Sequence, residues 1–260
     1  VDYVQSGTVT VQSQSGMSSF SELQRQTATY DSYHRPIRQA LSSAGTSYQI
    51  TDVRYDAVGR VQCSMMRMDP GNWSSLPSSC SPTQTTGPYG PDLVSYNYYD
   101  ALSRVWKITT GYGTTAAVNE RTATFTANGK LETIKDAESN RTTYEYDGHD
   151  RRVKTRFPVT TKGADQSSTT DYEQVSYDDN GNVSTFRTRR NETIQLTYDN
   201  LNRLVTKVVP ERSGLASSHT RDVHFRYDLL GNLTDARFDS LSGPGIVNVF
   251  NSLGQLTSTT

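Results

Sequence analysis

The sequence has few of the features that mark nucleic-acid-binding or membrane proteins. It contains 2 cysteines in 260 residues and has a formal net charge of -1, with basic and acidic residues interspersed. A nucleic-acid-binding surface normally needs clustered Lys and Arg, so this class is disfavoured. No apolar run approaches the about 18 residues of a membrane-spanning helix. We therefore expect no nucleic-acid partner and no membrane span.

Motifs of catalysis and cofactor binding are also missing. The sequence has no Gly-x-Ser-x-Gly elbow, HExxH, Walker loop or dinucleotide fingerprint. The four histidines lie apart, in turn-like or serine-rich segments or on an expected strand: His34, His149, His219 and His224. Residues 178–182 faintly resemble a calcium loop but lack its spacing and its distant bidentate Glu. We expect no enzyme activity, no cofactor and no metal site.

A repeated phrase is the main feature that is present. It reads aromatic–Asp, two variable residues, Gly or a substitute, Arg/Asn/Lys and an aliphatic residue. Clear copies begin at Tyr55, Tyr99, Tyr177, Tyr198 and Tyr227, and degenerate copies begin at Tyr30, Phe125, Tyr146 and Phe250. The turn residues of the clear copies are Asp56, Gly59, Arg60, Asp100, Arg104, Asp178, Gly181, Asp199, Arg203, Asp228 and Gly231. Such repetition decides the architecture, because each copy builds the same local unit.

Each copy predicts a β-hairpin. Successive aromatics lie 25, 44, 26, 21, 31, 21, 29 and 23 residues apart, by subtraction of their residue numbers. We interpret 21 as the basic unit and the longer values as that unit plus a loop. Val223, Phe225 and Tyr227 alternate with polar residues and lead into the turn, which is typical of a half-buried strand entering a hairpin. Because an isolated hairpin is marginally stable, the units must pair into one sheet.

The aspartates of the phrase have two interpretations. An Asp at the start of a turn can accept a hydrogen bond from the backbone two residues on, and Gly accepts the left-handed conformation of tight turns. Alternatively, paired carboxylates could act in catalysis. Since one Asp recurs in every turn whereas a catalytic pair would occur once, we favour a structural role in the turns.

The phrases YDAVGRV, YDDNGNV, YDNLNRL and YDLLGNL resemble the YD repeats of the Rhs/YD-repeat family. That family includes bacterial toxin shells and the teneurins, and the resemblance covers about residues 25–260. It implies tandem hairpins in one continuous, curved or spiralling antiparallel sheet that forms part of a β-shell. The family's Asp-Pro-x-Gly element and self-cleavage residues have no match here: Asp69-Pro70-Gly71 lies early and alone.

Domain organisation follows from the repeats. Residues 25–260 are expected to form the array, with a loop insertion at about 63–95, and residues 1–24 a lead-in with a strand around Val4, Val9 and Val11. Only 33% of the residues are hydrophobic, but 16 are Tyr. Tyr suits a sheet with wet faces, because its ring is apolar and its hydroxyl can meet water.

Cys63 and Cys80 fall within the expected insertion. A disulfide between them is plausible in an exported protein, because oxidising compartments preserve disulfides. Reduced thiols packed as small hydrophobes stay open, whereas zinc is disfavoured because no histidine lies at ligand spacing. Trp73, in the same segment, is a candidate for an exposed recognition residue or for a plug that packs the loop on the sheet.

The arginines Arg151-Arg152, Arg187 and Arg189-Arg190 also have two interpretations. They are typical of a solvated strand or turn, and a contact to phosphate or an acidic glycan is the alternative.

Three functions agree with these patterns. The first is a non-enzymatic scaffold, a section of a shell that encloses or presents another polypeptide such as a toxin. The second is a cell-surface adhesion or carbohydrate-binding module, and the third is a self-assembling filament subunit. The expected partners are other repeats of a longer parent chain or copies of the chain, with a polypeptide cargo or a surface glycan. We expect a bacterial protein that is secreted or at the cell surface. Since the sequence starts at Val1 without a recognisable export signal, we also expect it to be a segment of a longer chain.

Overall fold

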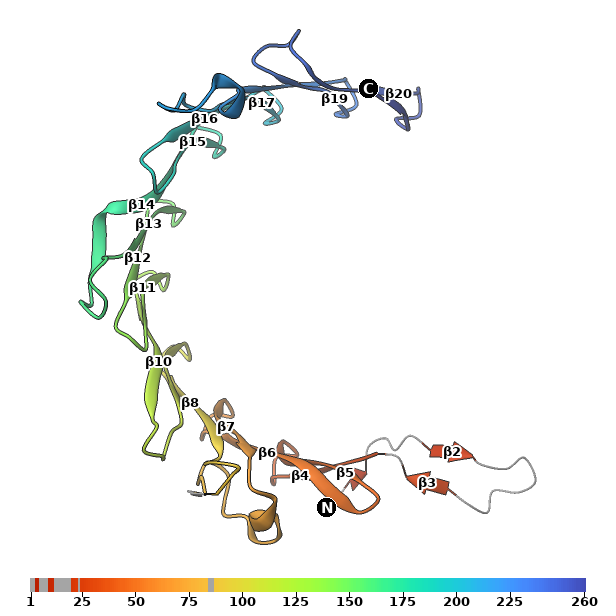
Figure 1. The fold of residues 1–260 in the computed structure, drawn as a ribbon, viewed down its shortest axis with the longest axis vertical. Coiled ribbons are helices and arrows are strands. Elements are labelled where there is room, and N and C mark those ends of the chain that lie inside the picture. The colour runs from red at the N-terminus through yellow and green to blue at the C-terminus, as the bar shows by residue number, and fades with distance from the viewer. Residues whose placement is uncertain (1–2, 5–8, 12–19, 23, 84–86) are drawn as a thin grey trace. The chain divides into compact units, whose positions relative to one another are not determined.

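In the computed structural model the chain is built from β-strands and two short 3-10 helices (Figure 1). The structure describes residues 3–4, 9–11, 20–22, 24–83 and 87–260. Among these residues, hydrogen bonding assigns 19 strands to one sheet and two to another. The strand pairs that the structure describes are antiparallel, so the prediction of an all-β array of hairpins is confirmed. The curvature and closure of a longer ribbon stay predictions.

The chain divides into two compact units, and the first comprises Val1–Thr124 with Ile134–Glu138. Its strands are β1 (Tyr3–Val4), β4 (Arg25–Tyr30), β5 (Pro36–Ser43), β6 (Thr46–Tyr55), β7 (Val61–Arg67), β8 (Leu93–Tyr99), β9 (Val105–Thr110) and β10 (Val118–Phe125). β1 pairs with β4, and from β4 to β10 each strand pairs with the next one along the chain. The unit is therefore a meander of hairpins.

The predicted lead-in contains more than one strand. β2 (Val9–Val11) pairs with β3 (Phe20–Glu22) in a separate two-stranded sheet. Val4 belongs instead to β1, which pairs with β4 of the array. The serine-rich segment of residues 12–19, expected to be flexible, lies outside the described residues. The domain boundary at residue 24 stays a prediction.

The apolar core lies in the first unit, under the largest loop. Its buried members are Cys63, Met65, Cys80, Val94 and Tyr96, and Tyr98 and Tyr112 pack against them. Because β7 continues to Arg67 and β8 begins at Leu93, the loop spans residues 68–92, with the 3-10 helix η1 (Pro70–Ser75) inside it. Cys63 thus lies on a strand, not in the insertion where the sequence placed it.

The second unit comprises Phe125–Thr133 and Ser139–Thr260. Its strands are β12 (Arg141–Tyr146), β13 (Arg152–Pro158), β14 (Ser167–Tyr177), β15 (Val183–Arg187), β16 (Thr193–Tyr198), β17 (Leu204–Val208), β18 (Val223–Tyr227), β19 (Leu233–Phe238), β20 (Gly245–Phe250) and β21 (Leu256–Thr259). β11 (Leu131–Asp136) is divided between the two units, and the 3-10 helix η2 (Ser217–His219) precedes β18. From β12 to β21 each strand pairs with the next.

The second unit is a single layer, since most of its strand residues are only half-buried. In such a meander every second connection lies at the same end of the strands. The turns of the repeated phrase therefore line one edge of the unit's ribbon and the longer loops line the other (Figure 1). This placement brings side chains of successive turns side by side.

Candidate functional site

The turn of the repeated phrase is closed by its aspartate, as the copy at Asp199 illustrates. Asp199 Oδ1 accepts hydrogen bonds from the backbone N–H groups of Leu201 and Arg203, both at 2.9 Å. The second carboxylate oxygen, Oδ2, accepts from Arg203 Nε at 2.7 Å. Asn202 has a positive φ of 61°, the left-handed conformation that the turn requires. One side chain thus organises a five-residue turn.

A capped turn recurs in every copy of the phrase, including the degenerate ones. The capping aspartates are Asp31, Asp56, Asp100, Asp147, Asp178, Asp199 and Asp228, whereas Thr126 takes this place in the copy at Phe125 and Asn251 in the last copy. Where Asn182 and Asn232 replace the arginine, their amide Nδ2 donates to the carboxylate instead. The left-handed residue is Gly in some copies and a polar residue in others: His34, Gly59, Ser103, Gly129, Asp150, Gly181, Asn202, Gly231 and Gly254.

The tyrosine of each phrase connects its turn to the preceding repeat. Tyr227 Oη donates to the carbonyl oxygen of Leu204 at 3.0 Å, and the guanidinium of Arg203 lies 4.8 Å from the centre of its ring. The same bond is made by the tyrosines at positions 55, 99, 146, 177 and 198 to the first residue after the preceding turn. Arginines of three further turns also lie over the next tyrosine ring: Arg35, Arg60 and Arg151. At these four places the arginine of one turn therefore stacks on the tyrosine of the next repeat.

A β-bulge positions each of these tyrosines. The strand register shifts between Thr197 and Tyr198 and between Arg226 and Tyr227, and likewise before the other phrase tyrosines. A bulge turns the local side chain and increases the strand twist. Here it directs the tyrosine toward the preceding hairpin just before the chain enters the capped turn.

Loss of the tyrosine hydroxyl at one turn should weaken the contact between two hairpins. Replacement of Tyr227 by Phe removes the bond to Leu204 and leaves that carbonyl without this donor. We expect the free energy of unfolding to fall by about 1 kcal/mol, measured by urea denaturation. The same replacement at the exposed Tyr89 should change it by less than about 0.5 kcal/mol. Equal effects at the two positions would contradict this role for the phrase tyrosine.

The turn carboxylates are held in the charged form. The pKa of Asp199 is lowered because the backbone N–H and the guanidinium of Arg203 bind the carboxylate. The pKa is lowered in the same direction at Asp31, Asp56, Asp100, Asp147, Asp178 and Asp228. At Asp56, Asp147 and Asp178 desolvation is the largest single effect and raises the pKa, but the hydrogen bonds together outweigh it.

Acid should therefore destabilise the array through its turns. A carboxylate whose pKa is lower in the folded state stabilises the fold above the unfolded pKa of about 3.9, and this contribution is lost as the pH falls through the folded value. We expect the melting temperature to be steady above about pH 5 and to fall steeply below about pH 4. Asp199→Asn should flatten that fall, and Asn251→Asp should steepen it. Superimposable pH profiles of the three proteins would contradict the turn as the origin.

A second cluster of charges, which the sequence did not predict, fastens the insertion to the first unit. Arg67 is 2% exposed and lies between Asp52 and Asp92, at 2.6 and 2.9 Å. Its remaining donors reach the carbonyl oxygens of Pro77, Ser78 and Ser81 in the loop. These groups are 10 to 25 residues away from Arg67 in the sequence.

Asp92 is the acidic partner at the end of the loop. Burial acts to raise its pKa, but the backbone N–H groups of Thr83 and Met68 and the Arg67 guanidinium bind the carboxylate and lower the pKa below its ordinary value. Arg38 adds a second cation that binds Asp52 through two nitrogen atoms. One sequence signal could have revealed the cluster. Asp52 lies two positions after Ile50 and therefore on the same, buried face of β6. A charged side chain on a buried face needs a partner of opposite charge.

The two cysteines form a disulfide, with their Cα atoms 6.0 Å apart. Of the disulfide and the reduced thiols that the sequence left open, the disulfide is therefore confirmed. It joins β7 to the loop beside the Arg67 cluster. Trp73 was a candidate for an exposed recognition residue. In the structure it is half-buried on η1. Its indole Nε1 is buried and has no hydrogen-bond partner in the described part of the chain. The indole therefore does not stand free on the surface.

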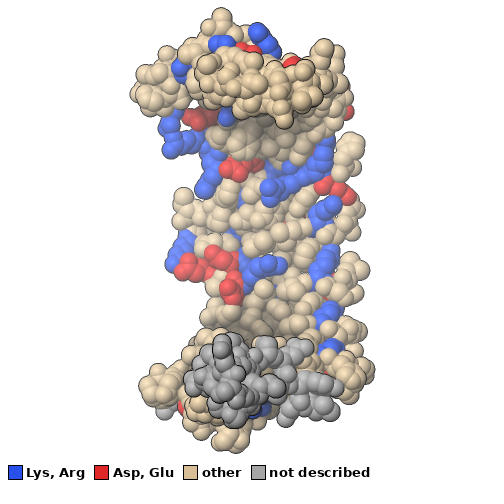
Figure 2. All heavy atoms as spheres, turned by 90° about the vertical axis from the view of Figure 1, so that its right-hand side faces the viewer, with Lys and Arg blue, Asp and Glu red and all other residues tan. Residues whose placement is uncertain are grey.

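Three of the arginines considered as anion contacts have structural partners. Arg151 binds Asp147 in its turn, and Arg189 binds Asp171 through two nitrogen atoms. Arg187 lies over the ring of Tyr172, 3.6 Å from its centre, and donates to Asn191. Figure 2 shows acidic side chains next to several of the basic groups on the face that it presents. This pairing favours the solvated, structural interpretation of these arginines.

The described residues contain no group of three or more His, Cys, Asp or Glu side chains with the geometry of a metal site. They also contain no helix with the length and apolar character needed to cross a bilayer.

Capped turns, bulged tyrosines and sequential strand pairing together define a β-hairpin repeat protein. The family comparison makes this specific, because the model of the RHS repeat matches residues 125–162. This segment of the chain is therefore similar to the RHS repeat. The matched segment begins at Phe125 and contains Tyr146, two copies that depart from the ideal phrase but adopt the same turn.

The solved structures that match the chain include TcdB2-TccC3 and a Tc holotoxin pore. The crystal structure of TcdB2-TccC3 is 16% identical with a TM-score of 0.48, and the match covers 92% of this chain and 13% of that one. A Photorhabdus luminescens Tc holotoxin pore is 13% identical with a TM-score of 0.29, covering 90% of this chain and 16% of that one. The chain thus spans a small part of the length of these proteins. A search of curated proteins finds no match.

Proposed function

We propose that the chain is a non-enzymatic scaffold, a section of an Rhs/YD-repeat shell that encloses or presents another polypeptide. This proposal rests on one observation, which is that the polar side chains of the phrase are bound within the sheet itself. Each Asp, Arg and Tyr binds its own turn or the neighbouring hairpin, as Asp199, Arg203 and Tyr227 do. Side chains whose hydrogen bonds are all made within the sheet serve its structure, and the resemblance to the Rhs/YD-repeat family supplies the expectation that such a sheet encloses a cargo.

Location and partners belong to the same proposal. The Cys63–Cys80 disulfide supports secretion or a place on the bacterial surface, because disulfides persist in oxidising compartments. The partners are then further repeats of a longer parent chain and a polypeptide cargo.

The gene product that contains this chain offers the test. Small-angle X-ray scattering should give the pair-distance distribution of a hollow particle. Limited proteolysis with mass spectrometry should leave a polypeptide outside this segment uncut while exposed loops, such as residues 159–166, are cleaved. A solid globule in which all segments are cut at similar rates would reject enclosure.

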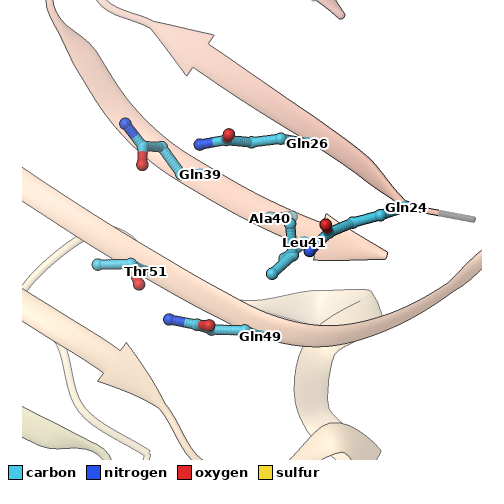
Figure 3. A pocket seen from close by; sticks show the side chains of 7 residues that line it. All are labelled: Gln24, Gln26, Gln39, Ala40, Leu41, Gln49 and Thr51. Carbon is cyan, nitrogen blue, oxygen red and sulfur yellow. The ribbon is translucent and has the colours of Figure 1, made fainter. Parts of the chain in front are cut away.

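A second candidate function, carbohydrate binding, is favoured by one pocket of the first unit. A shallow cavity of about 310 Å³ is lined by Gln24, Gln26, Gln39, Gln49 and Thr51, with Ala40 and Leu41 (Figure 3). Gln24 also donates to the hydroxyl of the half-exposed Tyr48 at 2.7 Å. Amide side chains that both donate and accept hydrogen bonds are suited to sugar hydroxyls.

A glycan array with the intact chain tests this candidate. Binding that is lost in Gln39→Ala and retained in the distant Gln195→Ala would support it. An array without signal would remove it and would leave the scaffold proposal untouched.

A further inference from the structure

Two aromatic side chains of the hairpin formed by β8 and β9 are not required by the repeat. Tyr98 lies immediately before the phrase tyrosine of its copy, and Trp106 lies seven positions after that tyrosine. The eight other copies have no aromatic residue at either position, and the copy at Tyr177 has Ser176 and Ser184 there. Because those copies form a capped turn without the two rings, the architecture of the repeat does not account for them.

The two rings lie at a cavity between neighbouring hairpins of the first unit. The described pairing of β7 with β8 ends at Cys63 and Tyr96. Nearer the turns, the carbonyl oxygen of Val61 accepts from the side chains of Asn97 and Tyr99, at 3.1 and 2.7 Å. The cavity at this place has a volume of about 450 Å³, which is within the range of ligand pockets of about 300–1,000 Å³.

Aromatic rings and an amide line this cavity, which we call the aromatic groove. Its lining includes Gln62, Tyr98, Tyr99 and Trp106. The ring centres of Tyr98 and Trp106 lie 6.0 Å apart, and their planes are tilted by 55°. Trp106 is 38% exposed, so part of its indole meets solvent. The aromatic groove thus presents ring surface and polar groups together.

Two cations beside the aromatic groove form no ion pair with the described residues. The ammonium of Lys107 lies 3.7 Å from the centre of the Tyr98 ring and 5.2 Å from that of Trp106. The guanidinium of Arg54 lies 5.8 Å from the centre of the Tyr96 ring, and its Nε is buried without a hydrogen-bond partner in the described part of the chain. The strand register places both cations on the same face of the sheet as Tyr96 and Tyr98, since directly opposite residues share a face.

The polar groups at the aromatic groove are mainly hydrogen-bond donors. A lysine ammonium, an arginine guanidinium and an indole N–H only donate, whereas the amide of Gln62 donates and accepts. A matching ligand therefore supplies acceptors, negative charge and an apolar surface for the rings. A proline-rich segment with an acidic residue supplies all three. Proline has no backbone N–H, so its backbone offers only carbonyl acceptors, and proline-rich segments dock into grooves lined by aromatic side chains.

Other classes of ligand match these groups less well. A purely apolar segment would cover the two cations without pairing them, which is costly. A polynucleotide needs a track of many cations, whereas two lie at the groove and the sequence has a net charge of -1. A neutral sugar offers donors as well as acceptors and no charge for the cations.

We propose that the aromatic groove binds a proline-rich segment of a partner polypeptide in the polyproline II conformation. The prolines pack on the rings of Tyr98 and Trp106, and an acidic residue of the segment pairs with Lys107. Such a segment loses little conformational entropy on binding, because polyproline II is already its preferred conformation. This inference goes beyond the scaffold proposal, since a wall of hairpins does not require a peptide groove.

Isothermal titration calorimetry with the full chain tests the groove. The probe is a synthetic peptide of eight prolines followed by two glutamates. We expect saturable binding, which should be about tenfold weaker when lysines replace the glutamates. A peptide with glycine and serine in place of the prolines should not bind saturably. Equal binding of the three peptides, or no binding of the first, would overturn the proposal.

Variants of the chain test the assignment of the residues. Trp106→Ala should weaken binding of the first peptide about tenfold. Lys107→Gln should retain binding and reduce the preference for glutamate over lysine to less than about threefold. The control Tyr89→Ala removes another exposed aromatic ring and should bind like the unmodified chain. Circular dichroism checks that each variant is folded. If Trp106→Ala does not fold, an undiminished glutamate preference in Lys107→Gln would still overturn the proposal.

Tryptophan fluorescence locates the bound peptide. Trp73 and Trp106 are the two tryptophans of the sequence, so Trp73→Phe leaves Trp106 as the reporter. The peptide should shift the emission of this variant to shorter wavelength, because prolines displace water from the indole, and should leave that of Trp106→Phe unchanged. A shift seen only in Trp106→Phe would overturn the location. Tighter binding of oligothymidylate or of a neutral oligosaccharide at Trp106 would overturn the ligand class. Either result would leave the scaffold proposal untouched, because scattering of the longer gene product tests that proposal.

Discussion

Replacement of Arg67 by Leu is expected to lower the free energy of unfolding by about 3–5 kcal/mol, the largest effect of any single substitution considered. The variant leaves Asp52 and Asp92 buried without their shared cation. It also removes the donors to the carbonyl oxygens of Pro77, Ser78 and Ser81. Loss of one member of a buried ion cluster costs more than the cluster contributes, because the remaining charges cannot reach water.

Urea denaturation followed by circular dichroism measures this effect. Arg212→Leu is the matched control, because Arg212 pairs with Glu192 at 3.5 Å on the surface and should cost less than about 1 kcal/mol. Protease cleavage should separate local from global loss: the Arg67 variant should be cut first within residues 68–92, which the arginine holds against the sheet. A loss below about 1 kcal/mol in the Arg67 variant would show that the cluster does not hold the loop.

Removal of the disulfide is expected to have the second-largest effect. The bond joins residues 17 positions apart, and a loop of this size corresponds to a loss of about 3 kcal/mol in Cys63→Ala/Cys80→Ala. The bond restricts the unfolded chain, and in the folded chain both cysteines are buried beside Met65 and Val94. The two alanines also remove packed sulfur atoms, which adds to the loss.

Reduction provides the internal control for the disulfide. Dithiothreitol should lower the melting temperature of the unmodified chain and leave that of the double alanine variant unchanged. Since Arg67 and the disulfide fasten the same loop, their effects should be less than additive when combined. A melting temperature of the unmodified chain that is indifferent to reductant would contradict the expected role.

The repeated turn could be predicted from the sequence because its interactions are local. Asp199 reaches partners two and four residues away, so the phrase itself contains donor, acceptor and left-handed residue. The alternation of apolar and polar residues in β16 and β18 could be recognised in the sequence for the same reason. The contact between repeats was only partly visible: the tyrosine was recognised as repeat-defining, but its bond to the preceding hairpin depends on the strand register.

The insertion was the part that sequence reasoning described least well. Cys63 was expected in the insertion at about residues 63–95, because this segment lies in the long gap between the copies at Tyr55 and Tyr99. In the structure Cys63, Met65 and Arg67 all face the buried side of β7. A buried arginine is recognisable only when its partners are known. Those partners, Asp52 and Asp92, come from two other places in the chain, 15 and 25 residues away.

By itself, the order of residues determined the class of fold, the hairpin unit and the turns, because each of these depends on groups a few positions apart. Tertiary structure alone decided which distant charges share the buried face of β6 and β7 and which hairpin each tyrosine contacts. The physical reason is that these contacts arise from strand pairing and from a folded loop, which bring together groups that no local pattern connects.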